Sequence, residues 1–147
     1  MSKSSAYDFL IEGHPVPWAA HKGFGRRSFN PRFKEKSYFQ WKIREQYKST
    51  LLKGPVHIFF EFLFSIPKSV SKKNRIKMIN HLEHHTKRPD VSNCVKFTED
   101  CLKGIVIEDD SQVVYLSASK GYSEHPCTKV HIVDLQEIDH RAKNDLS

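Results

Sequence analysis

The stretch VHIFFEFLFSI, residues 56–66, is the strongest strand signal in the chain, and the rest of the fold is predicted around it. Every second residue from Val56 to Ile66 is apolar. Because successive side chains of a strand point to opposite faces, these residues share one face. The other face mixes Phe59 and Leu63 with polar side chains. This pattern predicts a strand at the centre of a sheet.

Upstream of this strand, one short strand and one long helix are predicted. Residues 7–12, YDFLIE, predict the strand. Residues 32–52 carry apolar side chains four positions apart, which predicts an amphipathic helix that ends before Gly54 and Pro55. Pro and Gly interrupt every period in residues 14–31, so a loop is expected there.

Downstream, two helices and three strands are predicted. A short basic helix begins near Ser69 or Ser71. A second helix runs from Asp90 or Ser92 to about Lys103, where a glycine follows. Three strands are predicted at residues 105–108, 112–119 and 128–135, with the last two paired as a hairpin, and residues 136–147 are expected to form a frayed polar tail.

These elements predict a single α/β domain over residues 1–147, with a small mixed sheet of four to five strands flanked by helices. A chain of this length buries roughly two thirds of its unfolded surface on folding. Ten Phe, two Trp and five Tyr are abundant for that core. No apolar run approaches the ~20 residues of a membrane-spanning helix. The chain is therefore expected to be soluble.

The expected compartment is reducing and cytoplasmic. The N-terminal MSKSSAYDF lacks the apolar stretch of a secretory signal. The three cysteines, Cys94, Cys101 and Cys127, form neither an even disulfide framework nor a CxxC pair. Because Cys94 and Cys101 lie seven positions apart on a predicted helix, we interpret them as small core residues.

The net charge of +7 is distributed unevenly. Residues 1–89 carry 18 Lys and Arg against 6 acids, a net of +12, and residues 90–147 carry 6 against 11, a net of −5. A basic half favours a polyanionic partner. The acids that gather after it indicate either surface solvation or a cation site.

Polar side chains share one face of the helix predicted from residue 91. At 100° per residue, Asn93, Lys96 and Asp100 lie within about 60° of one another, opposite an apolar arc. The acids of residues 108–110 follow the next predicted strand, and adjacent acids repel one another unless a cation lies among them. Asp90 and one of these acids could therefore meet at a Mg²⁺ site, because Mg²⁺ is commonly held by one or two carboxylates, waters and phosphate oxygens.

The same residues also fit a purely structural interpretation. Asp90 or Ser92 is a good helix N-cap. Lys96 and Asp100 can form a solvated pair on the helix surface, and residues 108–111 can be a turn before a strand. Residue spacing alone leaves both interpretations open.

The order of these motifs resembles a family signature. The segment RPDVSNCVKFTEDCLKGIVIEDDSQVV, residues 88–114, is similar to the signature of the RusA family of Holliday-junction resolvases, which are crossover-junction endodeoxyribonucleases. Flanking segments also look like members of that family, so the resemblance spans most of residues 56–135. The positions that match the family pattern are Asp90, Asn93, Lys96, Asp100, Leu102, Gly104, Asp109, Asp110, Gln112 and Val113.

The resemblance implies a homodimer whose two Mg²⁺-dependent sites nick opposite strands of a four-way junction. Mn²⁺ is an alternative ion, and neither a small-molecule cofactor nor a membrane is implied. Asp90 and Asp110 are implied as metal-binding acids with Asp109 as their neighbour, and Lys96 as the essential basic residue. Asn93 and Asp100 are expected to support them. A bacterial, phage or prophage context follows from the same resemblance.

One position departs from the family pattern: Ser92 stands where the signature has its second aspartate. A neutral hydroxyl is a poor Mg²⁺ ligand beside a carboxylate, so less charge would hold the ion and activate water. Glu108 or Asp109 could substitute in space, the enzyme could work with weak metal affinity, or the chain could bind junctions without cutting them. Whether the serine is natural or was introduced also stays open.

Two cationic sets are predicted to contact DNA phosphates. The first is the loop of residues 14–36, in which aromatic side chains lie between the cations and could stack on exposed bases. The second lies in residues 68–88 and could line the same groove. The histidines of residues 81–85 match no zinc spacing pattern and are interpreted as a polar helix end beside DNA. The DNA-contacting candidates are Lys22, Arg26, Arg27, Arg32, Lys34, Lys72, Lys73, Arg75 and Arg88.

Overall fold

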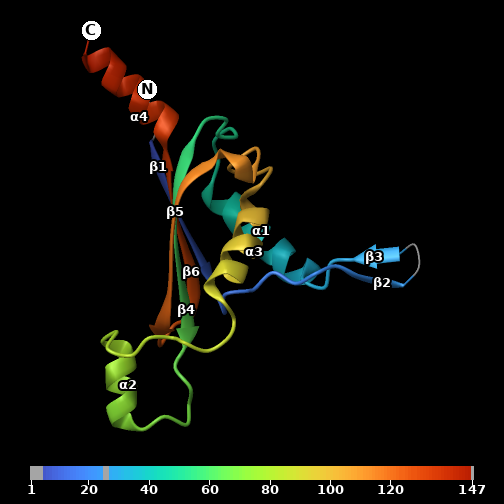
Figure 1. Ribbon diagram of the computed structural model, residues 1–147, viewed down its shortest axis with the longest axis vertical. Coiled ribbons are helices and arrows are strands. Elements are labelled where there is room, and N and C mark those ends of the chain that lie inside the picture. The colour runs from blue at the N-terminus through green and yellow to red at the C-terminus, as the bar shows by residue number, and fades with distance from the viewer. Residues whose placement is uncertain (1–4, 25–26, 147) are drawn as a thin grey trace.

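The computed structural model describes residues 5–24 and 27–146. At its centre is a four-stranded mixed sheet in the order β1 (Ala6–Glu12), β6 (Cys127–Asp134), β4 (Val56–Ser65), β5 (Val113–Ser123), shown in Figure 1. β4 pairs in parallel with β5 and antiparallel with β6, which pairs antiparallel with β1. The central position predicted for β4 is confirmed, as is the α/β class.

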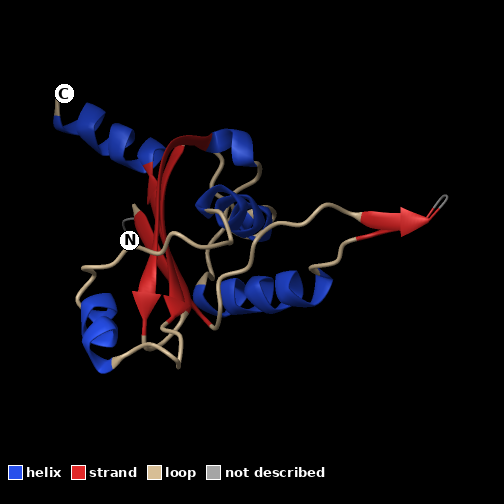
Figure 2. Ribbon diagram, turned by 60° about the horizontal axis from the view of Figure 1, so that its bottom comes forward, coloured by secondary structure: helices blue, strands red, loops and turns tan. Residues whose placement is uncertain are grey.

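Two helices, α1 (Phe33–Gln46) and α3 (Val91–Leu102), cover one face of this sheet (Figures 1 and 2). The alternate residues of β4 from Val56 to Phe64 are buried against them, as predicted. Between the two helices the rings of Phe39 and Phe97 meet edge to face, with centroids 5.1 Å apart. Each buried aromatic or aliphatic side chain of this layer contributes roughly 1.5–3 kcal/mol relative to exposure.

The predicted hairpin of the last two strands is wrong, because β4 lies between them. β5 and β6 are consecutive in the chain, yet each pairs with β4 on a different side. β4 is thereby paired along both edges, which satisfies its backbone N–H and C=O groups on each side.

The strand predicted at residues 105–108 is also absent from the structure. This segment is a turn in which Val106 and Ile107 are fully buried. The N–H of Leu52 donates to the carbonyl of Val106 over 2.8 Å, and Leu52 and Ile107 form a single bridge. This segment therefore packs into the core as a turn and is not a strand of the sheet.

Three further segments differ from the predictions: residues 14–31, the end of the first helix, and the C-terminal tail. The expected loop of residues 14–31 contains a short hairpin of β2 (Lys22–Phe24) and β3 (Arg27–Phe29). The helix predicted over residues 32–52 ends at Gln46, where the Gln46 side chain bonds both backbone groups of Leu10 in β1. The expected frayed tail is helix α4 (Leu135–Asp145), capped by the Asp134 carboxylate.

Three elements project from this two-layer body. The β2–β3 hairpin extends as an arm on the helix side of the sheet, and α2 (Lys72–Ile79) and α4 project beyond opposite ends of the sheet (Figure 1). Ser71, one of the two predicted starts, caps α2 and accepts from the N–H of Asn74 over 3.2 Å. Every helix among the described residues is too short or too polar to cross a membrane.

The cysteines are free and buried, as the sequence predicts. Burial raises the pKa of Cys101 to about 12 and that of Cys94 to about 11. Both thiols therefore stay protonated at neutral pH and serve as core side chains.

Candidate functional site

Helix α3 separates a buried face from a polar one, as the 100° periodicity predicts. Its apolar arc is buried, and the Thr98 hydroxyl on that arc donates to the Cys94 carbonyl over 2.8 Å. Ser92 and Lys96 are exposed on the other side, and Asn93 and Asp100 are half-buried. The expected supporting residues therefore share one solvent-accessible stripe along the helix.

Two of the three acidic residues predicted to bind metal, Asp109 and Asp110, lie at the C-terminal end of α3. The Lys103 ammonium lies 3.6 Å from the Asp109 carboxylate and 3.9 Å from that of Asp110. Both carboxylates are about half exposed. Burial and the neighbouring carboxylates of Asp110 and Asp100 raise the pKa of Glu99, against the effect of Lys103. Negative charge at this end of the helix is therefore only partly neutralised.

A short 3₁₀ turn, η1 (Asp110–Gln112), presents these acids to solvent. The Asp109 carboxylate accepts from the N–H of Ser111 over 3.1 Å. Hydrogen bonding from the Ser111 side chain, and then from this N–H, lowers the pKa of Asp109. The acids thus lie in a capped turn, and not at the end of a strand as predicted.

The Gln112 side chain fixes the acidic turn, a role that the sequence reasoning missed. Its Oε1 accepts from the N–H groups of Glu108 (2.7 Å) and Asp109 (2.8 Å). Its Nε2 donates to the carbonyls of Leu52 (2.7 Å) and Gly54 (2.9 Å), just before β4. The sequence contains a signal for this role, because Asp109 followed three positions later by Gln112 has the spacing of a capping box.

Asp90 lies at the other end of α3, as its N-cap residue. The loop before it is held by Lys120, whose ammonium donates to the carbonyls of Lys87 (2.6 Å) and Pro89 (3.0 Å). A helix of 12 residues is ~18 Å long at 1.5 Å per residue. The structure therefore brings Asp109 and Asp110 together, with Glu99 and Asp100 near them, but leaves Asp90 at the far end.

No group of three or more His, Cys, Asp or Glu side chains among residues 5–24 and 27–146 is arranged to hold a metal ion. A single Mg²⁺ ion holds oxygens at about 2.1 Å, so it cannot touch Asp90 and Asp110 in this arrangement.

Lys96, midway along the stripe, contacts an aromatic ring from a distant part of the chain. Its Nζ lies 3.5 Å from the centroid of the Trp18 ring. The backbone N–H of Trp18 donates to the carbonyl of Asn93 over 2.9 Å. Trp18 was not among the predicted site residues, since nothing in its local sequence points to α3.

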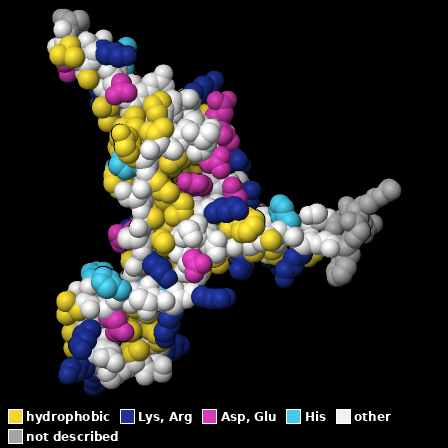
Figure 3. Space-filling model, in the orientation of Figure 1, with side chains coloured by type: hydrophobic (Ala, Val, Ile, Leu, Met, Phe, Trp, Pro, Cys, Tyr) yellow, Lys and Arg dark blue, Asp and Glu magenta, His cyan; other side chains and the backbone are white. Residues whose placement is uncertain are grey.

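The described cationic candidates lie on the β2–β3 arm, at the start of α1, on the α2 lobe and in the loop before α3. Lys22 is exposed on β2, and Lys34 is exposed at the start of α1, where the Arg32 guanidinium lies 3.7 Å from Glu35. Figure 3 shows a second group of blue side chains on the lobe that contains α2. That lobe carries Lys72, Lys73 and Arg75, and Arg88 is exposed in the loop that leads to α3. The side chain of Arg27 and all of Arg26 lie outside the described residues.

His85 does not belong to a polar surface beside DNA, which corrects the prediction for this residue. It is buried, its ring stacks on Phe64 with centroids 4.3 Å apart, and Tyr122 lies 4.9 Å away. Burial and the charges of Lys120 and Lys87 lower its pKa. His85 thus anchors the loop of residues 80–90 to the end of the sheet.

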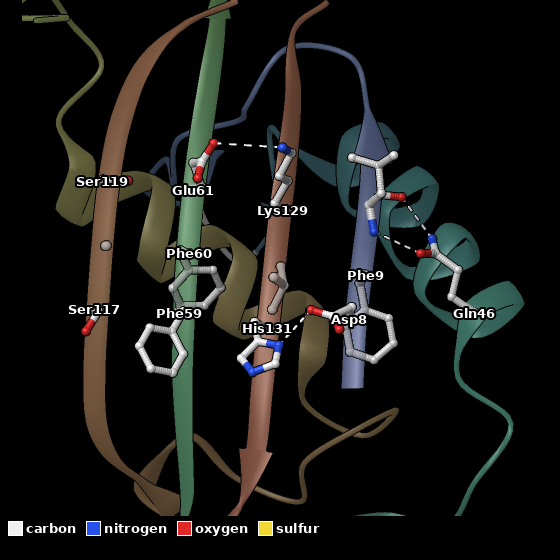
Figure 4. A pocket seen from close by; sticks show the side chains of 13 residues that line it. Asp8, Phe9, Gln46, Phe59, Phe60, Glu61, Ser117, Ser119, Lys129 and His131 are labelled. Atoms are coloured by element: carbon white, nitrogen blue, oxygen red, sulfur yellow. Dashed lines mark hydrogen bonds and ion pairs between the residues drawn. The ribbon is translucent and has the colours of Figure 1, made fainter. Parts of the chain in front are cut away.

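A broad depression of about 610 Å³ lies on the opposite face of the sheet, away from α3 (Figure 4). Phe59 lies at its centre among charged pairs that join neighbouring strands. The His131 ring nitrogen lies 2.6 Å from the Asp8 carboxylate, and Lys129 lies 4.0 Å from Glu61. These side chains are already paired with one another, and none of them belongs to the α3 stripe.

Comparison with known proteins places the chain in a sequence family. A family model described as "Endodeoxyribonuclease RusA" matches residues 21–133. The chain is also 36% identical over 135 residues to the "Uncharacterized protein YqaN" of Bacillus subtilis (strain 168), an alignment that covers 86% of this chain and 95% of the relative.

Proposed function

This chain belongs to the RusA endodeoxyribonuclease family, and on that basis we propose that it is a Mg²⁺-dependent endonuclease that resolves four-way DNA junctions by paired nicks. The observation that carries the proposal is the polar stripe of α3. It ends in partly neutralised carboxylates and lies between two basic projections, the β2–β3 arm and the α2 lobe (Figure 1). A phosphate backbone is attracted by the projections, while the stripe offers the groups that act on it.

The donor chemistry at the C-terminal end of α3 fits a hard divalent cation. Asp110 and Asp109 offer carboxylate oxygens, and Glu99 and Asp100 add negative charge beside them. We propose that Asp110 and Asp109 hold the ion, with waters and phosphate oxygens as the other ligands. When bound, Mg²⁺ would polarise the scissile phosphate and lower the pKa of a water molecule.

The chain's own residues would act on the phosphate from the stripe. Lys96 is the proposed catalytic cation, because it is exposed on the stripe and its ammonium can stabilise charge that develops on the phosphate or on the leaving oxygen. Asn93 is proposed to orient a water molecule or Asp90. Asp90 remains a proposed metal-binding acid, but in one chain it would hold an ion separate from that of Asp110 or require the chain to rearrange.

Ser92 supports a second candidate function, a junction-binding protein that cuts weakly or not at all. Ser92 is exposed in the first turn of α3, beside Asp90. A serine there brings no charge to a cation, whereas an aspartate would. The metal affinity at this end of the helix is therefore expected to be low.

Incubation of a labelled four-way junction with the chain, with and without Mg²⁺ or Mn²⁺, tests both candidates. Symmetric nicks that require the ion support the nuclease, and Asp110→Asn should then abolish nicking while junction binding is retained. Asp139→Asn on α4 is the matched control and should cut normally. Nicking that is undiminished in Asp110→Asn would refute the assignment of that residue.

The variant Ser92→Asp separates the two candidates. Cleavage by the unaltered chain supports the nuclease, and cleavage gained only by Ser92→Asp supports the junction-binding protein. Binding without any preference for four-way junctions over linear duplex would count against both.

Paired nicks on opposite strands need two sites, so we also propose a homodimer. The uncovered face of the sheet is the surface that we propose for the second copy, because Phe59 is 39% and Tyr115 62% exposed there. It carries both signs of charge, Asp8 and Glu61 with Lys129, which another copy can match and a polyanion cannot. Sedimentation equilibrium should give twice the chain mass and, for Phe59→Arg, a monomer.

A further inference from the structure

Two segments far apart in the sequence meet at the middle of the α3 stripe. Trp18 lies between β1 and β2, and Lys96 lies on α3, 78 positions later in the chain. The ammonium lies 3.5 Å from the ring centroid, well within the ~6 Å over which a cation is attracted to an indole face.

The position of Trp18 is set by the backbone and does not depend on the stacking alone. Its N–H donates to the Asn93 carbonyl, one turn before Lys96 on the same helix. Earlier in the segment, Pro15 is buried, and the N–H of Gly13 donates to the Pro126 carbonyl over 3.0 Å. Hydrogen bonds thus fix both ends of residues 13–18, the segment that places the indole against α3.

The ring is not a core side chain. Trp18 is 37% exposed, although an indole of its size would be buried if packing were its role. The indole face therefore contacts the ammonium while part of the ring stays open to solvent and to a bound ligand.

A second pair of the same type provides an internal comparison. On α1, the Lys42 ammonium lies 4.9 Å from the Trp41 ring centroid. These two residues are adjacent in sequence on one helix, and Trp41 is 55% exposed. Their contact needs no tertiary structure, whereas the closer contact of Trp18 with Lys96 requires two separate elements to be fixed.

We propose that Trp18 is a positioning residue that holds the Lys96 ammonium on the exposed stripe of α3, ready for the phosphate. This inference rests on the proposed nuclease function. A free lysine side chain samples many rotamers, and a cation–π contact restricts them before DNA binds. The preorganised charge then acts in the transition state more than in binding.

Kinetics test the positioning role. Trp18→Leu keeps bulk but removes the aromatic face, and it should slow single-turnover nicking about fivefold to tenfold with less than about a twofold change in junction Kd. Trp18→Phe retains an aromatic face and should restore most of the rate. Trp41→Leu is the matched control and should nick at the normal rate.

A double-mutant cycle tests whether Trp18 acts through Lys96. In a Lys96→Met background, Trp18→Leu should produce no further loss of nicking, because the ammonium that it positions is gone. An equal loss in both backgrounds, or a normal rate for Trp18→Leu, would overturn the proposal.

A readout without DNA separates this proposal from the proposed function. Lysine amines labelled with ¹³C-methyl groups by reductive methylation report on nearby rings by NMR. The Lys96 signal, identified by its loss in Lys96→Arg, should be shifted upfield by the indole ring current and return to the bulk position in Trp18→Leu. If the unaltered chain never nicks DNA, the nuclease proposal fails, and the Lys96 signal alone then decides the contact: an unshifted signal overturns it.

Discussion

The Asp110 carboxylate lies 3.9 Å from the Lys103 ammonium, at the opposite end of α3 from Asp90. The same ammonium lies 3.6 Å from Asp109. A single lysine thus pairs with two carboxylates, leaves them with net negative charge, and lies at the Mg²⁺ site that we propose. Lys103 and the ion are expected to compete.

Replacement of Lys103 by Gln should therefore strengthen Mg²⁺ binding. A unit charge and a divalent ion 4 Å apart in water repel by about 2 kcal/mol before salt screening, so the apparent Kd should fall about tenfold. The measurement is the rise of Tm as MgCl₂ is added at constant ionic strength. Lys42→Gln, which removes the exposed pair with Glu45 on α1, is the control and should titrate like the unaltered chain. Weaker binding by Lys103→Gln would contradict the metal site.

The Gln112 side chain should contribute more to stability than its exposed turn suggests. Gln112→Ala removes four hydrogen bonds that join the acidic turn to the segment before β4. At about 0.5–1.5 kcal/mol each, with partial replacement by water, a loss of about 2 kcal/mol is expected in urea denaturation. Gln112→Glu keeps the acceptor and loses the donor, so it should also destabilise the chain. A change below about 0.5 kcal/mol for Gln112→Ala would show that the turn holds without it.

Local patterns predicted the elements whose stability depends on their own periodicity. Alternation in β4 and the 100° arc of α3 were predicted correctly because each buries one continuous face against a partner. The starts of α2 and α3 were each predicted to within two candidate residues, and the structure selects Ser71 and Asp90 as the N-cap positions. These features need no knowledge of distant residues.

Strand order could not be predicted, because a short connection fits two topologies. Only residues 124–126 join β5 to β6, which suggests a hairpin. An extended chain covers about 3.5 Å per residue, and two strand spacings are about 9.6 Å, so the same connection can also cross one intervening strand. The structure shows which topology forms, because β4 pairs with β5 along one edge and with β6 along the other.

The candidate site was predictable in its parts and not in its contacts. The acids and Lys96 followed from the resemblance, but Trp18 and His85 acquire their roles only through tertiary contacts with α3 and β4. The separation of Asp90 from Asp110 was equally hidden, since the return segment after α3 was predicted as a strand and is a buried turn.

His85 should make stability depend on pH. Its pKa in the folded protein is lowered from 6.5 by burial, Lys120 and Lys87, so the unfolded chain binds a proton first as the pH falls. The free energy of unfolding should therefore decrease as the pH drops below about 6.5, by up to about 1.4 kcal/mol per pH unit until the folded protein is also protonated. Urea denaturation between pH 5 and 7.5 measures this dependence. His85→Phe, which keeps an aromatic ring on Phe64, should reduce the pH dependence of the free energy of unfolding. His84→Phe, which replaces an exposed histidine next to it, should leave that dependence unchanged.

Lys72 and Lys73 on α2 should contact DNA phosphates and set part of the salt dependence of binding. Each phosphate contact contributes about 0.9 to the slope of log K against log salt, so a Lys72→Gln and Lys73→Gln double variant should lower the slope by nearly 2. The loss should be similar for four-way junctions of different base sequence, because phosphate contacts carry no sequence information. Fluorescence anisotropy between 50 and 250 mM NaCl measures each slope. Lys143→Gln on α4, away from both basic projections, is the control for net charge. If the double variant and this control change the slope equally per charge removed, α2 is not in the interface.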